Sequence, residues 1–178
     1  MKKLLIALTA LSFLFVSSYS QAWQPDDQDE MELSVAKAIL DAKNDDPSLA
    51  KWFDTAYAYA VFPNVGKGGI GIGGAHGKGI VIQGDKTIGT TSLSQITIGF
   101  QLGGQVYAEY IMFKDETAFK NFSRGNFEMS AQVSAVAVTA GASADTNYNS
   151  GVAVFTRAGG GLMYEASVGG QKFKYESK

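Results

Sequence analysis

The spacing of hydrophobic and polar residues predicts two helices near the start of the chain. From Asp29 to Ala42 the apolar residues recur at helical spacing, while acidic residues and Lys37 face the other way. Asp46-Pro47 is a favourable helix start, because aspartate caps a helix and proline fits its first turn. The second helix is expected to turn four side chains inward: Leu49, Trp52, Phe53 and Ala56.

After residue 56 the pattern changes to short apolar runs separated by glycine, which predicts strands. We expect strands over residues 57–62, 68–75, 79–83, 87–91, 95–102, 106–113, 130–140, 151–156, 161–168 and 172–175. Gly84-Asp85 and Gly103-Gly104 predict hairpin turns, and Asp115 is expected to cap a short helix that bears Ala118, Phe119 and Phe122. Together these elements predict an α+β fold. Its bent antiparallel sheet, open or barrel-like, is covered by the N-terminal helices.

Between Ala56 and Gly79 glycine alternates with isoleucine, where a half-buried strand would normally place polar residues. Ile70 and Ile72 fall on one face of this run, and three glycines fall on the other: Gly69, Gly71 and Gly73. Glycine weakens a strand and leaves no side chain to pack. We therefore expect another backbone, a helix or a ligand to lie close against the bare face.

Five segments of the chain, in this order, resemble the bacterial members of the SYLF domain family. They are AYAYAVFPNVGKGGIGIGGAHGKG at residues 56–79, TSLSQITIGFQLGGQ at 91–105, NFE at 126–128, AVAVTAGASA at 135–144 and GLMYEASVGGQ at 161–171. The resemblance implies a lipid-binding domain, and it does not imply an enzyme. In eukaryotic relatives this domain accompanies membrane-trafficking or cytoskeletal modules and can bind actin.

The N-terminal helix departs from the family's pattern. In some eukaryotic members this helix is basic and contacts the membrane. Here it carries Asp29, Glu30, Glu32 and Asp41 against only Lys37 and Lys43. The departure speaks against phosphoinositide binding, and actin is not expected as a partner in a bacterial envelope.

The first 22 residues resemble a cleavable signal peptide. Lys2 and Lys3 precede an apolar run from Leu4 to Val16, and Ser20-Gln21-Ala22 offers small residues for signal peptidase. The run is shorter than the roughly 20 residues of a membrane-spanning helix. We expect cleavage after Ala22, a mobile lead-in over residues 23–28, a single domain over 29–178, and a location in the periplasm.

The chain contains no cysteine. Many bacterial SYLF proteins look like lipoproteins, which need a cysteine at the cleavage point, and this chain departs from that pattern. Disulfides are excluded for the same reason. Loss of Lys2 and Lys3 changes the formal net charge from −2 to −4, which disfavours nucleic-acid binding and broad attraction to anionic lipid. Any lipid contact must therefore come from local basic residues or from apolar burial.

Other chemistry finds little support in the sequence. Gly66, Gly68 and Gly71 match G-x-G-x-x-G, but no helix follows them to receive a phosphate, so nucleotide binding is not expected. One histidine and no cysteine rule out the usual zinc clusters. The segment Gly141–Asp145 differs from the G-x-S-x-G motif of the nucleophile elbow at its last position, where aspartate replaces glycine. We expect no catalytic residue, no cofactor and no metal, although acid–base work by Glu109, Glu128 or Glu165 stays open.

The remaining candidates are basic or aromatic. Lys67, His76 and Lys78 lie beside backbone that glycine leaves open, where amide groups can form an anion site for a phospholipid headgroup. The plainer interpretation makes them turn residues kept polar for solubility. Trp23 could enter a bilayer interface. We therefore expect an exported lipid-binding protein that contacts phospholipid or a membrane surface. The alternative is an envelope protein whose glycine-rich sheet pairs with itself or with another envelope protein.

Overall fold

The computed structural model describes residues 22–99, 104–124, 127–129, 148–158, 161–163 and 170–178. Within these residues the helices are α1 (Glu30–Asp45), α2 (Leu49–Thr55) and α3 (Glu116–Ser123). The strands are β1 (Ala58–Gln83), β2 (Lys86–Gly99), β3 (Gln105–Phe113), β4 (Phe127–Glu128), β5 (Val152–Ala158), β6 (Gly161–Met163) and β7 (Lys172–Ser177).

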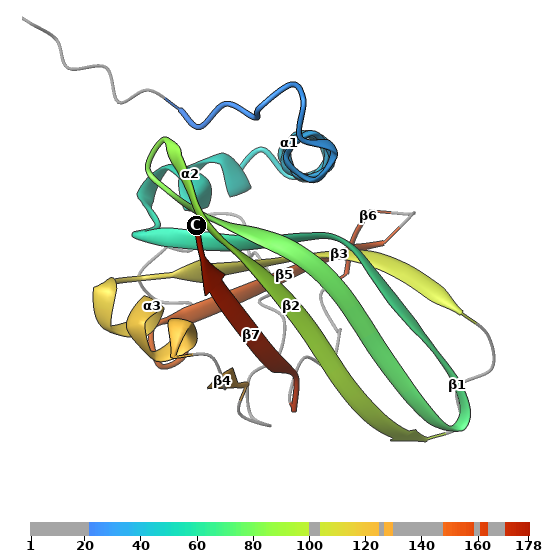
Figure 1. Ribbon diagram of the computed structural model, residues 1–178. Helices are drawn as coiled ribbons and strands as arrows, with labels where there is room; N and C mark the ends of the chain where they lie inside the picture. Colours follow the sequence, from blue (N-terminus) through green and yellow to red (C-terminus); the bar gives the residue numbers. More distant parts are fainter. Residues whose placement is uncertain (1–21, 100–103, 125–126, 130–147, 159–160, 164–169) are drawn as a thin grey trace, which may run out of the picture.

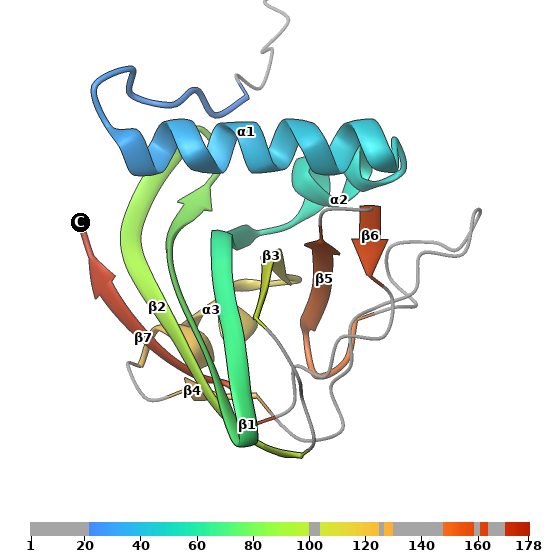
Figure 2. The same ribbon diagram turned by 90° about the vertical axis from the view of Figure 1, so that its right-hand side faces the viewer.

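The strands form one sheet in the order β4-β7-β2-β1-β3-β5-β6, and each pairing is antiparallel. The sheet is strongly curved, and α1 lies across one end of it with α2 beside it (Figures 1 and 2). This confirms the predicted α+β fold with a bent antiparallel sheet and covering N-terminal helices.

The predicted cap of α3 is confirmed, since the carboxylate of Asp115 accepts a hydrogen bond from Ala118 N. The predicted cap of α2 is wrong: this helix begins at Leu49, and Asp46 accepts from Ser48 N before it. At α1 the carboxylate of Asp29 forms an unpredicted cap, which accepts from the backbone N–H groups of Met31 and Glu32. In α2 the inward residues are Leu49, Trp52 and Phe53.

The glycine-rich run forms the middle of one long strand, β1, which doubles back on itself (Figure 1). Its first part pairs with β3 and its last part with β2. Pro63 does not end the strand; the pairing register shifts between Phe62 and Val65 instead. We call residues 69–73, where β1 turns, the β1 tip. Gly69 has φ +152° there, a conformation that favours glycine.

One predicted hairpin is wrong. The sequence suggested that Gly103-Gly104 joins two paired strands, but β2 and β3 do not pair; each pairs with β1, which lies between them. A turn signal shows where the chain reverses, whereas the partner of the next strand depends on the whole sheet. The hairpin at Gly84-Asp85 is confirmed by the pairing of Gln83 with Lys86. The predicted strand 130–140 lies outside the described residues, as do residues 164–168 of the strand predicted over 161–168.

Each face of the sheet has its own hydrophobic core. One core contains the inward residues of α1 and α2 together with Tyr59, Val61, Ile80, Ile82, Ala108, Tyr110, Met112, Ala153 and Phe155. The other contains α3 residues and Ala60, Phe62, Val65, Ala75, Leu93, Ile111, Val154 and Phe173. Successive side chains of a strand point to opposite faces, so these two sets identify the face of every regular strand residue.

The end of α1 is joined to the sheet by polar contacts. The buried Tyr110 hydroxyl donates to the carbonyl oxygen of Ala38 at 2.8 Å. Arg157 of β5 forms ion pairs with Asp45 at 2.6 Å and with Asp41 at 3.7 Å. These contacts attach the C-terminal half of α1 to β3 and β5.

Candidate functional site

His76 and Lys78 are exposed on the face of the sheet that carries α1. Ile80 and Ile82 follow them at two-residue intervals along β1 and therefore point to the same face. Both isoleucines are buried in the core beneath α1 and α2. Beyond α1 the same face is open. Two of the three predicted basic residues therefore lie on one surface.

Strand β7 adds two lysines to this surface. Lys78 is opposite Ser92, which is opposite Lys174; His76 is opposite Ser94, which is opposite Lys172. Directly opposed residues share a face, and neighbouring strands are about 4.8 Å apart, so each row spans about 10 Å. We call His76, Lys78, Lys172 and Lys174 the basic face.

The basic face is hollowed rather than flat. One hollow, of about 430 Å³, lies between Met31 of α1 and the row of Lys78, Ser92 and Lys174. A second, of about 420 Å³, is lined by residues that include His76 and Lys172. Ser92 and Lys174 line both hollows. Ammonium and hydroxyl donors gathered in this way suit a phosphate group.

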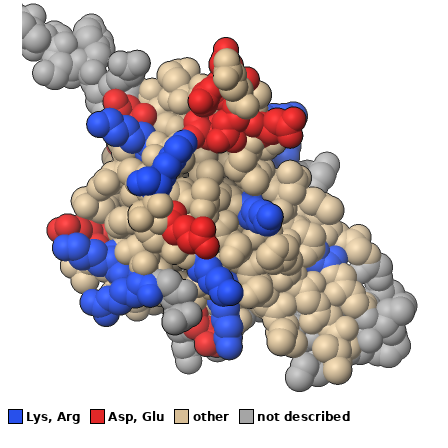
Figure 3. Space-filling view, viewed as in Figure 1, with Lys and Arg blue, Asp and Glu red and all other residues tan. Residues whose placement is uncertain are grey.

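Two acidic residues border the basic face. Glu128 of β4 lies 3.8 Å from the ammonium group of Lys172, and Glu176 lines the first hollow. Each lies at one end of the surface, so the basic groups at its centre stay exposed. In Figure 3 lysine and arginine side chains lie across this view with acidic ones scattered among them.

A third hollow, of about 300 Å³, lies on the other side of α1 and is lined by Lys37, Asp41 and Arg157 among others. Its charges are already matched. Lys37 is 2.8 Å from Asp41, and Arg157 pairs with Asp41 and Asp45. The hydrogen bond to Asp45 raises the pKa of Arg157, and the one from Lys37 lowers the pKa of Asp41. We interpret this hollow as part of the α1 attachment.

Lys67 does not belong to the basic face. It lies two residues after Val65 and is opposite Gln105, while Val65 is opposite the buried Tyr107. Val65 and Tyr107 belong to the core on the face away from α1. Lys67 therefore points to the opposite side of the sheet from His76 and Lys78, and the predicted three-residue cluster is divided.

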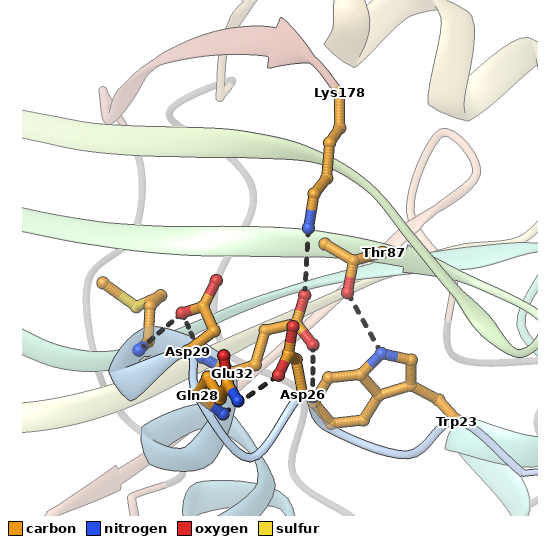
Figure 4. Close-up of polar contacts among 8 residues, drawn as sticks. Trp23, Asp26, Gln28, Asp29, Glu32, Thr87 and Lys178 are labelled. Carbon is orange, nitrogen blue, oxygen red and sulfur yellow. Dashed lines mark hydrogen bonds and ion pairs between the residues drawn. The ribbon is translucent and has the colours of Figure 1, made fainter.

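Trp23 also has a different place from the one expected. Its indole N–H donates to Thr87 Oγ1 at 3.1 Å, and its ring packs against the core beneath α1 (Figure 4). Three residues on, Asp26 N donates to the carboxylate of the buried Glu32, which also contacts the ammonium group of Lys178. The segment 23–28 is thus bonded to the domain, and Trp23 is left out of the lipid contacts proposed below.

Close backbone approach occurs at some of the expected glycines and at others that the sequence did not mark. A methyl group on Gly69 would overlap the backbone of Gly73, but the surroundings of Gly71 lie outside the described residues. The tightest approach is at Gly79, where a methyl group would overlap the carbonyl group of Val61. At Gly79 the second arm of β1 therefore lies close against the first arm.

A buried carboxyl group lies on the opposite face of the sheet. Glu109 is fully buried, and Gln171 Nε2 donates to its Oε2 at 2.9 Å. Burial raises the pKa of Glu109 to about 8, against a smaller lowering effect of the Gln171 hydrogen bond. The exposed Glu128 lies on β4, so these two carboxylates do not form an acid–base pair. Glu165 lies outside the described residues.

Among the described residues no three His, Asp or Glu side chains gather in a way that could hold a metal ion. In the same part of the chain, no helix has both the length and the apolar character needed to cross a bilayer.

The fold and the basic face together define a small curled-sheet domain with an open cationic surface. Residues 94–177 match the family described as Las17-binding protein actin regulator (Ysc84). The chain is also 30% identical over 138 residues to beta cell expansion factor A of Aeromonas veronii, covering 76% of this chain and 52% of that protein. Together with the motifs above, these matches show that the chain belongs to the SYLF (Ysc84) family. The chain spans about half the length of the curated relative that it matches.

Proposed function

We propose that this protein is an exported, non-enzymatic lipid-binding protein of the cell envelope that holds phospholipid headgroups on its basic face. Membership of the SYLF family supports a lipid-binding role in general. One observation carries the finer proposal. Lys78, Ser92 and Lys174 form a row across three strands, with a parallel row of His76, Ser94 and Lys172 beside it, and both rows line open hollows.

The charge balance agrees with local binding. The chain is acidic overall, so long-range attraction to an anionic bilayer is weak. A lysine close to such a surface contributes about 1 kcal/mol. The three lysines of the basic face thus give modest affinity, which salt weakens but apolar contacts retain.

The test is co-sedimentation with vesicles of equal parts phosphatidylcholine and phosphatidylglycerol. The double variant Lys78→Ala/Lys174→Ala is expected to bind about tenfold to thirtyfold more weakly, since two lysines supply about 2 kcal/mol. The matched control is Lys51→Ala/Lys120→Ala. It changes the net charge equally on α2 and α3, away from the basic face, and is expected to bind like the parent.

Equal weakening of both double variants would show that only overall charge matters and would contradict a local site. Failure of the parent to bind any vesicle would contradict lipid binding itself. The alternative, an envelope protein that pairs through its glycine-rich sheet, finds less support, because β1 lies inside the sheet between β2 and β3.

A further inference from the structure

Large apolar side chains are exposed at the end of the sheet where β1 turns. Ile72 of the β1 tip is 72% exposed, and Ile96 of β2, which is opposite Gly74, is 83% exposed. We call these two residues the apolar end.

The apolar end lies on the same face of the sheet as the basic face. Ile72 and His76 are four residues apart on β1, and Ile96 and Ser94 are two residues apart on β2. An even spacing along a strand puts both members of each pair on the same face. The open surface therefore changes along the strands from basic, near α1, to apolar at the end.

The stretches of sequence that carry the apolar end contain no acidic residue. Residues 64–79 and 92–107 include Lys67, His76 and Lys78 but neither aspartate nor glutamate. The turn of β1 projects away from the helices in Figure 1, and the corresponding corner of Figure 3 shows no red. An apolar end with His76, Lys78 and Lys174 behind it complements an anionic lipid surface.

The spacing along β1 also suits a bilayer. At about 3.3 Å per residue, His76 lies about 13 Å and Lys78 about 20 Å behind Ile72. The headgroup layer on each side of the hydrocarbon is about 5–8 Å thick. With the strands tilted to the surface, Ile72 reaches the hydrocarbon boundary while the long lysine side chains reach the phosphates.

We propose that the apolar end inserts into the boundary of an anionic phospholipid bilayer while the basic face holds the headgroups. This inference rests on the proposed function and adds the orientation of the molecule on the membrane. A second copy is a poorer occupant of the same surface, because residues 64–79 and 92–107 of that copy contain no acidic side chain that could pair with the lysines and histidine.

The first experiment uses the absence of native cysteine. Ile96→Cys and the control Leu40→Cys, on the exposed side of α1, are each labelled with an environment-sensitive fluorophore. On adding the phosphatidylcholine–phosphatidylglycerol vesicles, the label at position 96 is expected to shift to the blue and brighten, and the label at position 40 to stay unchanged. An unchanged label at position 96 on protein that co-sediments would overturn the proposal.

The second experiment compares two apolar pairs in exported, purified protein. Ile72→Ser/Ile96→Ser is expected to bind the vesicles at least about tenfold more weakly, because burying even part of an isoleucine side chain is worth a tenfold change. Leu33→Ser/Leu40→Ser removes two exposed leucines of α1 and is expected to change binding less than about twofold. Unchanged thermal unfolding shows that each variant is folded, and the cysteine label tests the same surface independently.

The outcomes separate this inference from the proposed function. If the lysine pair weakens binding and the isoleucine pair does not, headgroup binding holds and insertion is wrong. If the parent does not bind vesicles, both are wrong. If sedimentation without vesicles shows oligomers that Ile72→Ser/Ile96→Ser dissociates, the apolar end pairs with another copy and insertion is overturned.

Discussion

At the scale of single residues, the pKa of Glu109 depends strongly on its surroundings. It lies on the face opposite the basic face, fully buried, with one hydrogen bond from Gln171. Burial penalises its charged form and raises its pKa from 4.5 to about 8. The folded protein therefore holds this proton at neutral pH, whereas the unfolded chain releases it.

The pKa of Glu109 predicts how stability depends on pH. Between pH 4.5 and about 8 the unfolded chain has lost the proton and the folded protein has not, so stability falls as pH rises. The slope from this group reaches about 1.4 kcal/mol per pH unit. Glu109→Gln is expected to remove that slope, so the free energy of unfolding of the variant increases relative to that of the parent as pH rises. Urea unfolding at pH 5 and pH 8.5 measures it.

Glu128→Gln is the control for this measurement, since Glu128 is exposed on β4. It is expected to follow the parent's pH dependence closely. Identical pH slopes for the parent and Glu109→Gln would show that Glu109 ionises in the folded protein as it does in the unfolded chain.

At the scale of elements, β1 determines both the sheet and the candidate site. Its two arms lie side by side because glycine lets the backbones meet, most closely where Gly79 lies against Val61 and Phe62. The first arm pairs with β3 and the second arm pairs with β2. Strand β2 in turn pairs with β7, which carries Lys172 and Lys174. The basic face therefore depends on how β1 turns.

Substitution of Gly79 tests this close approach. Gly79→Ala is expected to lower the free energy of unfolding by about 1–3 kcal/mol, because the added methyl group overlaps a backbone carbonyl. Gly66→Ala is the matched control: its methyl group would meet only a carbonyl oxygen 4.0 Å away, and the expected change is within about 0.5 kcal/mol. Urea denaturation measures both. Equal stability of the two variants would contradict the close packing of the arms.

At the scale of the whole molecule, the domain separates its stabilising core from its open surface. The helices α1 and α2 cover one end of the sheet, and the same face continues beyond them as the basic face and then the apolar end. The polar contacts of Trp23 and Glu32 bind the segment before α1 to this arrangement. The proposed place in the cell envelope lies outside the cytoplasm, so export is part of the proposal.

Export predicts a defined N-terminus. We expect cleavage after Ala22, so that the mature protein begins at Trp23, because a basic start, an apolar run and small residues occur in order. N-terminal sequencing of the protein from a periplasmic extract measures this directly. The comparison is Ala22→Tyr, which removes the small residue at the cleavage point and is expected to slow processing. Recovery of a chain that begins at Met1 from parent cells would contradict export.

The sequence by itself determined the local features of this protein, and the tertiary structure decided those that join distant segments. Asp29 and Asp115 cap helices, and Gly84 turns a hairpin, because these preferences act within a few residues. Alternation likewise put His76 and Lys78 on one face. Lys172 and Lys174 are two residues apart, so the sequence alone indicates that both lie on one side of their strand. That this side continues the surface of His76 and Lys78 follows only from the register of β7 on β2. The division of Lys67 from Lys78, the engagement of Trp23 and the raised pKa of Glu109 follow from folding and burial, which depend on contacts far apart in the chain.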